Sequence, residues 1–326
     1  MQSGIVISPM ARTSETLRPQ IAEDITQLVG ETPILHLRRL SGGVAGEVFA
    51  KLEYLNPGGS VKDRAAMGMI DRAEALGFLG PGYTIIEATA GNTGIGLSLI
   101  GINRGYKVIL CVPERFSEEK VKVMAALGAK VIRTPDADGM LGAIAKAKAI
   151  AAETPDSYTA LQFENLANPA FHYQTTGQEI LEQMDNKIDA VVIGIGTGGT
   201  FSGVARRIKE KLPNVIAVAV ETQGSVLQGG PPGPHEVEGI GVSFIPRTYD
   251  GTLADEIMMV KDDEAFCMVR LLARKEGVLS GSSGGANVFA ALSVARRLGP
   301  GKRVVTVVPD SAERYLSKGI FDEEKT

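Results

Sequence analysis

A lysine follows a turn of small residues in the stretch NPGGSVKDRAA (56–66), where a helix is predicted to begin near Lys62. The start of a helix carries a partial positive charge, which disfavours an ammonium group there and lowers its pKa. An amine with a lowered pKa is a better nucleophile toward an aldehyde. We therefore expect chemistry at Lys62, whereas the alternative for any lysine taken alone is a solvated surface side chain.

Three glycine-rich turns accompany this lysine: TAGNTG (89–94), GIGTGGT (194–200) and GSSGG (281–285). In an open parallel sheet, ligands bind where strands end and helices begin. The second turn follows a predicted strand and opens a helix, so its amides and the hydroxyls of Thr197 and Thr200 can hold a phosphate. A tight turn without a ligand is the alternative. A lysine beside a phosphate cradle indicates an aldehyde cofactor that bears a phosphate, which describes pyridoxal 5'-phosphate (PLP).

The same turn also matches a dinucleotide-binding pattern. Gly194, Gly196 and Gly199 satisfy GxGxxG, and Glu221 lies about 20 residues further on, where such folds place an acid on the ribose. This alternative predicts a nicotinamide-dependent oxidoreductase in which Lys62 is dispensable. It leaves NPGGSVK and TAGNTG without a purpose.

Short β-rich apolar runs alternate with longer helical patterns from about residue 84 onward. Such alternation is typical of βαβ units and of a parallel sheet that is buried on both faces, so the fold class is α/β. Ser60 is a plausible N-cap for the helix near Lys62, and Gly277 ends a helix that starts near Asp262. The predicted strands are 84–89, 107–113, 130–135, 190–196, 215–221 and 303–309.

Turn-rich segments break this pattern and divide the chain. The length of 326 residues is large for one simple core. NPGGS and QFENLANPA flank a block with the size of a small domain. We predict a smaller domain at 55–164 and a larger domain made of 1–54 and 165–326, with the first twenty residues as a loose arm.

Composition excludes several classes of protein. The net charge is -4 and the basic residues are interleaved with acidic ones, which argues against nucleic acid as a partner. No apolar run is long enough for a membrane span, and the N-terminal apolar run is too short for a signal peptide. Cys111 and Cys267 are expected to be buried, reduced thiols, which favours a cytoplasmic location. The three histidines, His36, His172 and His235, share no ligand spacing, so no metal is expected.

Several ordered motifs now resemble one family. Six motifs are similar to those of the cysteine synthase and cystathionine β-synthase family, the fold type II PLP enzymes. They are NPGGSVKDR, TAGNTGIG, QFENLANPAFHYQTTGQEI, GIGTGGT, GPHEVEGIG and PDSAERYLS. The resemblance runs from about Ile25 to the C-terminus. It implies a two-domain fold with parallel-type sheets flanked by helices, in which the smaller domain is mobile, and a homodimer.

The resemblance also implies roles for particular residues. Lys62 matches the lysine that holds PLP as a Schiff base, removes the Cα proton of the substrate and later returns one. Asn92 matches the asparagine that is hydrogen-bonded to the phenolic oxygen of the cofactor. Ser283 matches the serine that faces the pyridine nitrogen, with Ser282 as the alternative position. The matched phosphate cup comprises Gly196, Thr197, Gly198, Gly199 and Thr200.

A neutral hydroxyl at the pyridine nitrogen leaves that nitrogen unprotonated, which favours loss of a β-leaving group over transamination. From local sequence alone, a helix-capping role fits Ser283 almost equally well. The resemblance places the substrate carboxylate on backbone amides and hydroxyls of the second motif, where Ala90 replaces the serine common in the family. The residues implied for substrate binding are Thr89, Ala90, Gly91, Thr93 and Gln162.

The expected reaction is a β-replacement on O-acetylserine. Sulfide as the nucleophile gives cysteine and acetate, as in cysteine synthase, and this is the first hypothesis. Homocysteine gives cystathionine, and the hydroxyl that is missing at Ala90 leaves room for this longer thiol. Serine or O-phosphoserine as the donor, and a non-catalytic binding or scaffold protein that keeps the fold, are further alternatives.

Overall fold

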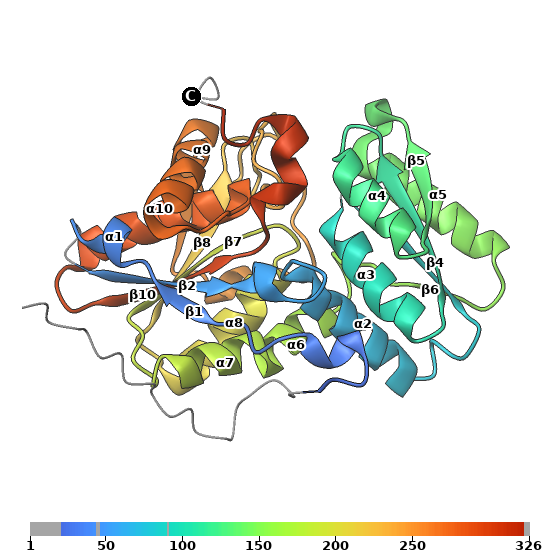
Figure 1. The fold of residues 1–326 in the computed structure, drawn as a ribbon, viewed down its shortest axis with the longest axis horizontal. Helices are drawn as coiled ribbons and strands as arrows, with labels where there is room; N and C mark the ends of the chain where they lie inside the picture. The colour runs from blue at the N-terminus through green and yellow to red at the C-terminus, as the bar shows by residue number, and fades with distance from the viewer. Residues whose placement is uncertain (1–20, 44–45, 90, 323–326) are drawn as a thin grey trace, which may run out of the picture.

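The computed structural model describes residues 21–43, 46–89 and 91–322. Its strands form two sheets, and helices cover both faces of each sheet (Figure 1). In the larger sheet β1 runs antiparallel to β2, while every other strand pair among the described residues is parallel. The strand order there is β1 (Ile34–His36), β2 (Glu47–Leu52), β10 (Arg303–Val308), β7 (Ala190–Gly194), β8 (Ile216–Thr222) and β9 (Glu256–Val260).

The smaller sheet has four strands, and all of its pairs are parallel. Parallel neighbours need crossover connections, and helices supply them here. The strand order is β5 (Lys130–Thr134), β4 (Lys107–Pro113), β3 (Thr84–Ala88) and β6 (Ser157–Thr159).

Ten α-helices lie within the described residues, together with short 3₁₀ and π turns. The helices are α1 (Arg38–Ser41), α2 (Lys62–Ala75), α3 (Asn92–Asn103), α4 (Glu118–Ala126), α5 (Gly139–Glu153), α6 (Ala167–Gln174), α7 (Thr176–Gln183), α8 (Gly199–Lys211), α9 (Asp262–Leu271) and α10 (Ser282–Leu298). The 3₁₀ turns are η1 (Ile25–Leu28), η2 (Glu53–Leu55), η3 (Asp136–Asp138), η4 (Gly251–Leu253) and η6 (Ala312–Lys318), and η5 (Leu272–Glu276) is a π turn.

Alternate residues of each central strand enter different cores, because successive side chains point to opposite faces of a sheet. In β7, Val192 packs in a cluster with residues of α10, whereas Val191 packs in another with Phe201 of α8. Figure 1 shows the same layering, with α9 and α10 on one face of the larger sheet and α7 and α8 on the other. A strand buried on both faces reads as a continuous apolar run, which is why these strands are visible in the sequence.

Helix α2 packs against α3, which covers the smaller sheet, and against α6. Its N-terminal residue is Lys62, and Figure 1 shows α2 between the larger sheet and the smaller one. The boundaries of the two domains and the mobility of the smaller one stay predictions.

All six predicted strands are present within two residues of their expected ends. Four strands were not predicted: β1, β2, β6 and β9. β1 and β6 have only three residues each, too few for a clear alternation, and β9 is an edge strand with a half-exposed Met259. β2 lies beside β10 and brings the segment before residue 55 into the larger sheet.

The predictions for Gly277 and Cys111 are confirmed, whereas the one for Cys267 is wrong. Gly277 does end its helix, with φ +69°, after α9 continues through the π turn η5. The prediction for Cys267 is wrong: this free thiol is exposed, because it lies on the solvent side of α9 while its neighbours Phe266 and Met268 are buried. Cys111 is buried, as predicted.

No helix in the described part of the chain is both long and apolar enough to cross a membrane.

Candidate active site

Lys62 is held at the carboxyl end of β10. The backbone N–H of Val61 donates to the carbonyl of Pro309 (2.8 Å), and Ser60 forms an isolated β-bridge with Asp310. The backbone N–H of Lys62 donates to Ser60 Oγ (3.2 Å), although the residue in the cap position of α2 is Val61, not Ser60 as predicted. These contacts fasten the start of α2 to the edge of the larger sheet.

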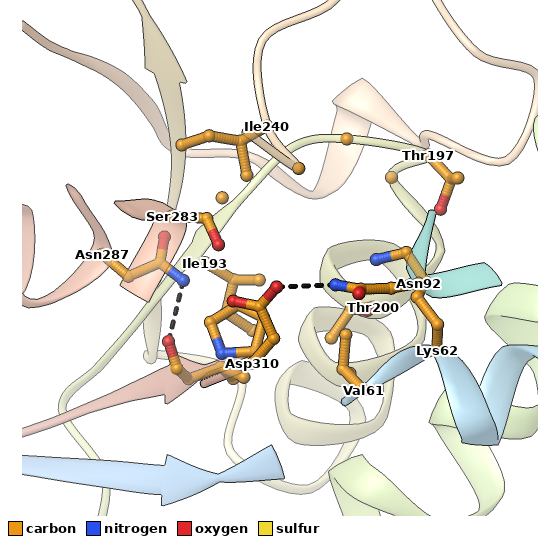
Figure 2. A pocket seen from close by; sticks show the side chains of 16 residues that line it. Val61, Lys62, Asn92, Ile193, Thr197, Thr200, Ile240, Ser283, Asn287 and Asp310 are labelled. Atoms are coloured by element: carbon orange, nitrogen blue, oxygen red, sulfur yellow. Dashed lines mark hydrogen bonds between the residues drawn. The ribbon is translucent and has the colours of Figure 1, made fainter. Parts of the chain in front are cut away.

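One cavity gathers residues from segments far apart in the sequence (Figure 2). Figure 2 shows Lys62, Asn92 and Thr197 on one side, Ser283 and Asn287 on the other, and Asp310 between them. The site residues predicted from sequence that line this cavity are Lys62, Asn92, Gly196, Thr197, Gly198, Thr200 and Ser283.

The pKa of the Lys62 amine lies below its ordinary value. Burial is the main cause, the positive charge of Lys120 acts in the same direction, and the carboxylate of Asp310 opposes both. The sequence predicts this direction from the helix start, but removal of the amine from water dominates. The described residues place no hydrogen-bond or ion-pair partner on this amine. A neutral amine is the form that attacks an aldehyde.

The glycine loop between β7 and α8 forms one wall of the cavity. Gly198 has φ +83°, a conformation that suits glycine, and a Cβ there would lie 2.5 Å from the Cβ of Tyr249. Thr197 Oγ1 accepts a hydrogen bond from Asn168 Nδ2 (3.1 Å), which leaves the proton of its hydroxyl free to be donated. Gly199 lies outside the lining and packs on Asn168 instead.

A buried histidine supports this loop from behind. His172 Nε2 lies 3.2 Å from Thr200 Oγ1, and its Nδ1 lies 2.8 Å from Thr176 Oγ1. Burial lowers the pKa of His172 to about 3, so the ring is neutral at physiological pH. Sequence reasoning considered this histidine only as a metal ligand, since nothing in its local pattern points to the distant loop. Among the described residues no cluster of side chains suits a metal ion.

The two serines at the start of α10 make different contacts. Ser283 lines the cavity, whereas Ser282 Oγ accepts a hydrogen bond from the backbone N–H of Glu238 (3.0 Å). Asn287, one turn further along α10, donates to the carbonyl of Val307 (2.9 Å), and its buried Oδ1 has no partner in the described structure. This end of the cavity therefore presents a hydroxyl and an unused amide oxygen.

Four further predicted residues form two hydrogen-bonded pairs. Thr93 Oγ1 donates to Gln162 Oε1 (2.6 Å), and the backbone N–H of Gly91 donates to Thr89 Oγ1 (3.0 Å). None of these four residues lines the cavity around Lys62. Gly91 has φ +143°, and a Cβ there would collide with the side chain of Lys120. Ala90 lies outside the described residues.

Sequence reasoning missed two polar residues of the segment after β10. Asp310 lines the cavity, and Asn92 Nδ2 donates to its Oδ2 (2.6 Å). Arg314 Nη1 donates to Asn92 Oδ1 (2.7 Å). The signal for Asp310 is present in the sequence, because it follows the carboxyl end of a predicted parallel strand, where ligand sites form.

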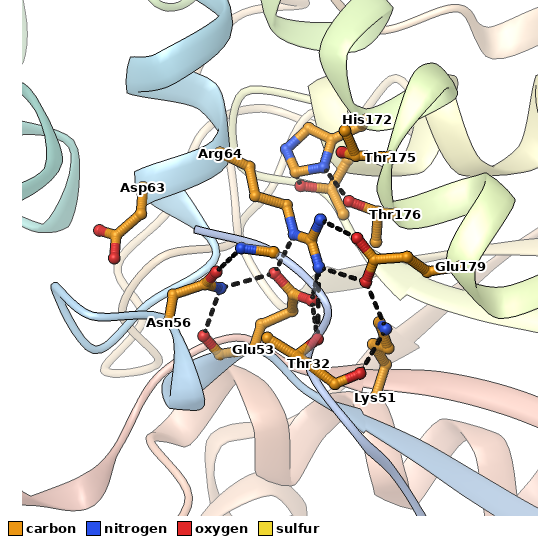
Figure 3. A network of polar contacts seen from close by, with 12 residues as sticks. Thr32, Lys51, Glu53, Asn56, Asp63, Arg64, His172, Thr175, Thr176 and Glu179 are labelled. Atoms are coloured by element: carbon orange, nitrogen blue, oxygen red, sulfur yellow. Dashed lines mark hydrogen bonds and ion pairs between the residues drawn. The ribbon is translucent and has the colours of Figure 1, made fainter. Parts of the chain in front are cut away.

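A second polar cluster surrounds Arg64, two residues after Lys62 on the same helix (Figure 3). The guanidinium is completely buried and forms paired hydrogen bonds with both Glu53 (2.7 and 2.9 Å) and Glu179 (2.6 and 2.7 Å). Lys51 donates to Glu179 (2.6 Å), to the Thr32 carbonyl (2.6 Å) and to Gln183 (2.8 Å), so its three protons are all used. This cluster ties α2 to β2, η2 and α7.

Glu221 does not behave as the acid of a dinucleotide site. Its buried carboxylate accepts hydrogen bonds from the backbone N–H of Leu227 (3.1 Å) and from Gln228 Nε2 (2.7 Å). It therefore holds the loop that follows β8, and the oxidoreductase alternative receives no support.

The groups in the cavity fit PLP. The amides at the start of α8, with the hydroxyls of Thr197 and Thr200, suit a phosphate, because a helix N-terminus and hydroxyl groups favour an anion. The amine of Lys62 suits the aldehyde. Ser283, on the opposite side, can hydrogen-bond a ring nitrogen.

Comparison with known proteins agrees with this geometry. The family model described as pyridoxal-phosphate dependent enzyme matches residues 25–310. The O-acetylserine dependent cystathionine beta-synthase of Bacillus subtilis is 50% identical over 302 residues, which cover 93% of this chain and 98% of that protein. A cysteine synthase of Staphylococcus aureus is 47% identical over 301 residues, with 92% and 97% coverage.

Solved structures give the same result. The crystal structure of the O-acetylserine dependent cystathionine beta-synthase from Helicobacter pylori superimposes with a TM-score of 0.90 at 47% sequence identity, covering 93% of this chain and 100% of that chain. The family match spans most of the chain, and its cofactor is the one that the cavity fits. The chain therefore belongs to the pyridoxal-phosphate dependent enzymes, within the fold type II group that contains cysteine synthase and cystathionine β-synthase.

Proposed function

We propose that this enzyme catalyses a PLP-dependent β-replacement on O-acetylserine. The observation that carries the proposal is that Lys62, with an amine whose pKa is lowered, shares a cavity with the glycine and threonine loop at the start of α8. The names of the relatives from B. subtilis and S. aureus support it. PLP, when bound, supplies an electron sink for negative charge at the substrate Cα.

The proposed cofactor contacts come from four segments. The loop 196–200 would hold the phosphate, and the helix N-terminus would balance its charge. Lys62 bonds the aldehyde carbon, Asn92 donates to the phenolic oxygen, and the Ser283 hydroxyl faces the ring nitrogen.

Lys62 also moves the proton in this proposal. With PLP and the substrate bound, the amine of Lys62 would be free to accept the proton from Cα. The Cβ–O bond breaks and acetate leaves with the electron pair. A thiolate then forms the new Cβ–S bond, and Lys62 returns a proton to Cα. Burial favours this role, because it lowers the pKa of the amine and so increases the share of the amine that can accept a proton.

The substrate carboxylate binds the loop 89–94 in this proposal. The N-terminus of α3 begins at Asn92 and offers amides to an anion. Gly91 is hydrogen-bonded to Thr89, and Thr93 to Gln162, so these residues are already held by hydrogen bonds before the substrate binds.

The nucleophile is sulfide in the first proposal, which gives cysteine. The second candidate is homocysteine, which gives cystathionine, and a specific observation favours it. The B. subtilis and H. pylori relatives, at 50% and 47% identity, are both named O-acetylserine dependent cystathionine beta-synthase. The S. aureus cysteine synthase, at 47%, is as similar as the H. pylori relative and slightly less similar than the B. subtilis one.

The test supplies the PLP-loaded enzyme with O-acetylserine and either sulfide or homocysteine, and measures acetate and the amino-acid product by mass spectrometry. The nucleophile with the larger kcat/KM names the activity. Serine and O-phosphoserine serve as competing donors. Release of no acetate in the presence of either nucleophile would contradict the proposal.

We infer in addition that the enzyme is a homodimer, as the family resemblance implies, and that it is cytoplasmic, as its two free cysteines indicate. Light scattering during gel filtration would then give about twice the chain mass of 34.4 kDa. A mass equal to that of one chain would contradict the dimer.

A further inference from the structure

The amide of Asn92 lies between two charged side chains of the segment that follows β10. Asn92 Nδ2 donates to Asp310 Oδ2 (2.6 Å), as Figure 2 shows, and Arg314 Nη1 donates to Asn92 Oδ1 (2.7 Å). Asn92 is the first residue of α3, while Asp310 and Arg314 lie in a segment that belongs with the larger sheet. The side chain of Asn92 is thus hydrogen-bonded to two residues that come from the other side of the cavity.

These two partners permit only one orientation of the amide. A guanidinium can only donate hydrogen bonds, and a carboxylate can only accept them. A flipped amide would set its NH2 group against the guanidinium and its oxygen against the carboxylate, and would lose two charge-assisted hydrogen bonds. The oxygen of Asn92 is therefore fixed toward Arg314 and its nitrogen toward Asp310.

The partners are themselves held in place. Asp310 is 1% exposed, its backbone carbonyl accepts from the N–H of Gly281 (3.0 Å), and Tyr315 Oη donates to its carboxylate. Arg314 Nη2 donates to the carbonyl of Gly58, in the turn before Lys62. Gly59, with φ +76°, would bring any Cβ into contact with the same guanidinium. Because Gly59 has no Cβ, the turn leaves room for the guanidinium of Arg314.

We infer that Arg314 and Asp310 are positioning residues that fix Asn92 as a hydrogen-bond donor toward the bound cofactor. The NH2 group has two hydrogens, and Asp310 accepts one of them. The second hydrogen remains for the phenolic oxygen of PLP, which is an acceptor. The inference rests on the proposed role of Asn92, and it adds that this role requires a guanidinium from the distant segment.

The test is a double-mutant cycle on cofactor binding, without substrate. Arg314→Met, Asn92→Ala and the double variant are titrated with PLP, and the dissociation constant and the visible absorption of the lysine-linked cofactor are recorded. We expect Arg314→Met to weaken PLP binding about tenfold in the wild-type background and to change the absorption. In the Asn92→Ala background the same substitution should change neither, because no amide remains to be oriented.

Two controls separate orientation from folding. Arg297→Met removes a half-exposed guanidinium that pairs with Glu256 (3.0 Å) from the C-terminal end of α10, and it should leave both readouts unchanged. Arg314→Lys keeps a donor and should restore part of the affinity. Urea unfolding of each variant without PLP shows whether the fold is intact.

The outcomes are distinct. Equal losses from Arg314→Met in both backgrounds would overturn the inference, because the arginine would then act independently of Asn92. An unchanged affinity and absorption in Arg314→Met would also overturn it, even if Asn92→Ala weakens binding. Failure of the proposed function would differ from both, since the wild-type protein would then bind no PLP or release no acetate from O-acetylserine.

Discussion

Lys62 and Arg64 stand two residues apart on α2, yet their surroundings are opposite. Arg64 is completely buried and hydrogen-bonded to two carboxylates, and Lys51 beside it uses all three of its protons (Figure 3). The Lys62 amine, in the cavity of Figure 2, has no hydrogen-bond partner among the described residues. Both clusters are polar, but only one has unused bonding capacity.

This difference separates structure from function on one helix. A buried charge with all of its hydrogen bonds made holds elements together, and it has nothing left for a ligand. An amine that faces a cavity and has no hydrogen-bond partner among the described residues can still bind a ligand, and groups with a perturbed pKa cluster at functional sites. If burial of a polar residue were the only criterion for a functional residue, Arg64 would be chosen and Lys62 would be missed.

The largest expected effect is on activity. Lys62→Ala should lower kcat/KM by about 10⁴-fold, because one amine acts as both the cofactor-bonding group and the proton acceptor. The unfolding free energy of the PLP-free protein should change by less than about 0.5 kcal/mol, since no partner of Lys62 is lost. Steady-state kinetics and urea unfolding check the two parts. A large loss of stability would place Lys62 with Arg64 as a structural residue.

Arg64→Met should have the reverse pattern. Removing one member of a buried ion-paired cluster leaves Glu53 and Glu179 without their partner and should cost about 3 to 5 kcal/mol of unfolding free energy. The matched control is Lys122→Met, which removes an exposed ion pair to Glu118 (3.9 Å) and should cost less than about 1 kcal/mol. Urea unfolding measures both. Similar costs for the two variants would refute the structural role of the Arg64 cluster.

The pH dependence of stability sharpens the comparison for carboxylates. Burial alone would raise the pKa of Glu53, but the charge and hydrogen bonds of Arg64 lower it from 4.5 to about 2. In Glu87, of the smaller sheet, burial raises the pKa from 4.5 to about 8, and amide donors oppose it only in part. The stabilisation from Glu53 is present above pH 4.5 and is lost as the pH falls to about 2. The contribution of Glu87 is present below pH 4.5 and is lost as the pH rises through about 8.

Carboxyl ¹³C NMR with labelled glutamate should therefore find titrations near pH 2 and near pH 8. Glu53→Gln should remove one of the titrations near pH 2, and Glu87→Gln should remove the one near pH 8. Glu87→Gln should also flatten the loss of stability between pH 4.5 and 8 in urea unfolding. If Glu87 titrated near pH 4.5, the prediction would be wrong, because its surroundings would then be polar enough to solvate the charged carboxylate.

The smallest expected effects are those of Ser282→Ala and Ser283→Ala, which distinguish the roles of these two neighbouring serines. Ser282→Ala removes the acceptor for the N–H of Glu238 and should cost about 1 kcal/mol of unfolding free energy, with an unchanged absorption of bound PLP. Ser283→Ala should change that absorption and leave the stability nearly unchanged, because Ser283 faces the cavity. Absorption spectra and urea unfolding of the two variants decide. The reversed pattern would make Ser282 the partner of the ring nitrogen.

Much of the fold could be read from the sequence by itself. The central strands are buried on both faces, so each appears as a continuous apolar run, and every glycine loop follows the strand or opens the helix that its position predicts. The resemblance of ordered motifs identified the family and its cofactor, because Lys62, Asn92 and the phosphate loop lie within local motifs. Three-residue strands such as β1 and β6 were not visible, since pairing with neighbours, and not local pattern, makes them strands.

Only the tertiary structure decided which polar residues act together. His172 meets Thr200, and Arg314 meets Asn92, across gaps in the sequence that no local pattern spans. The sequence predicted a lowered pKa for Lys62 from the helix start, whereas its main cause is burial, which depends on every segment packed around the amine. Local patterns report the conformation of the chain, while solvent exclusion and hydrogen-bond partners are set by segments that meet only in the folded protein.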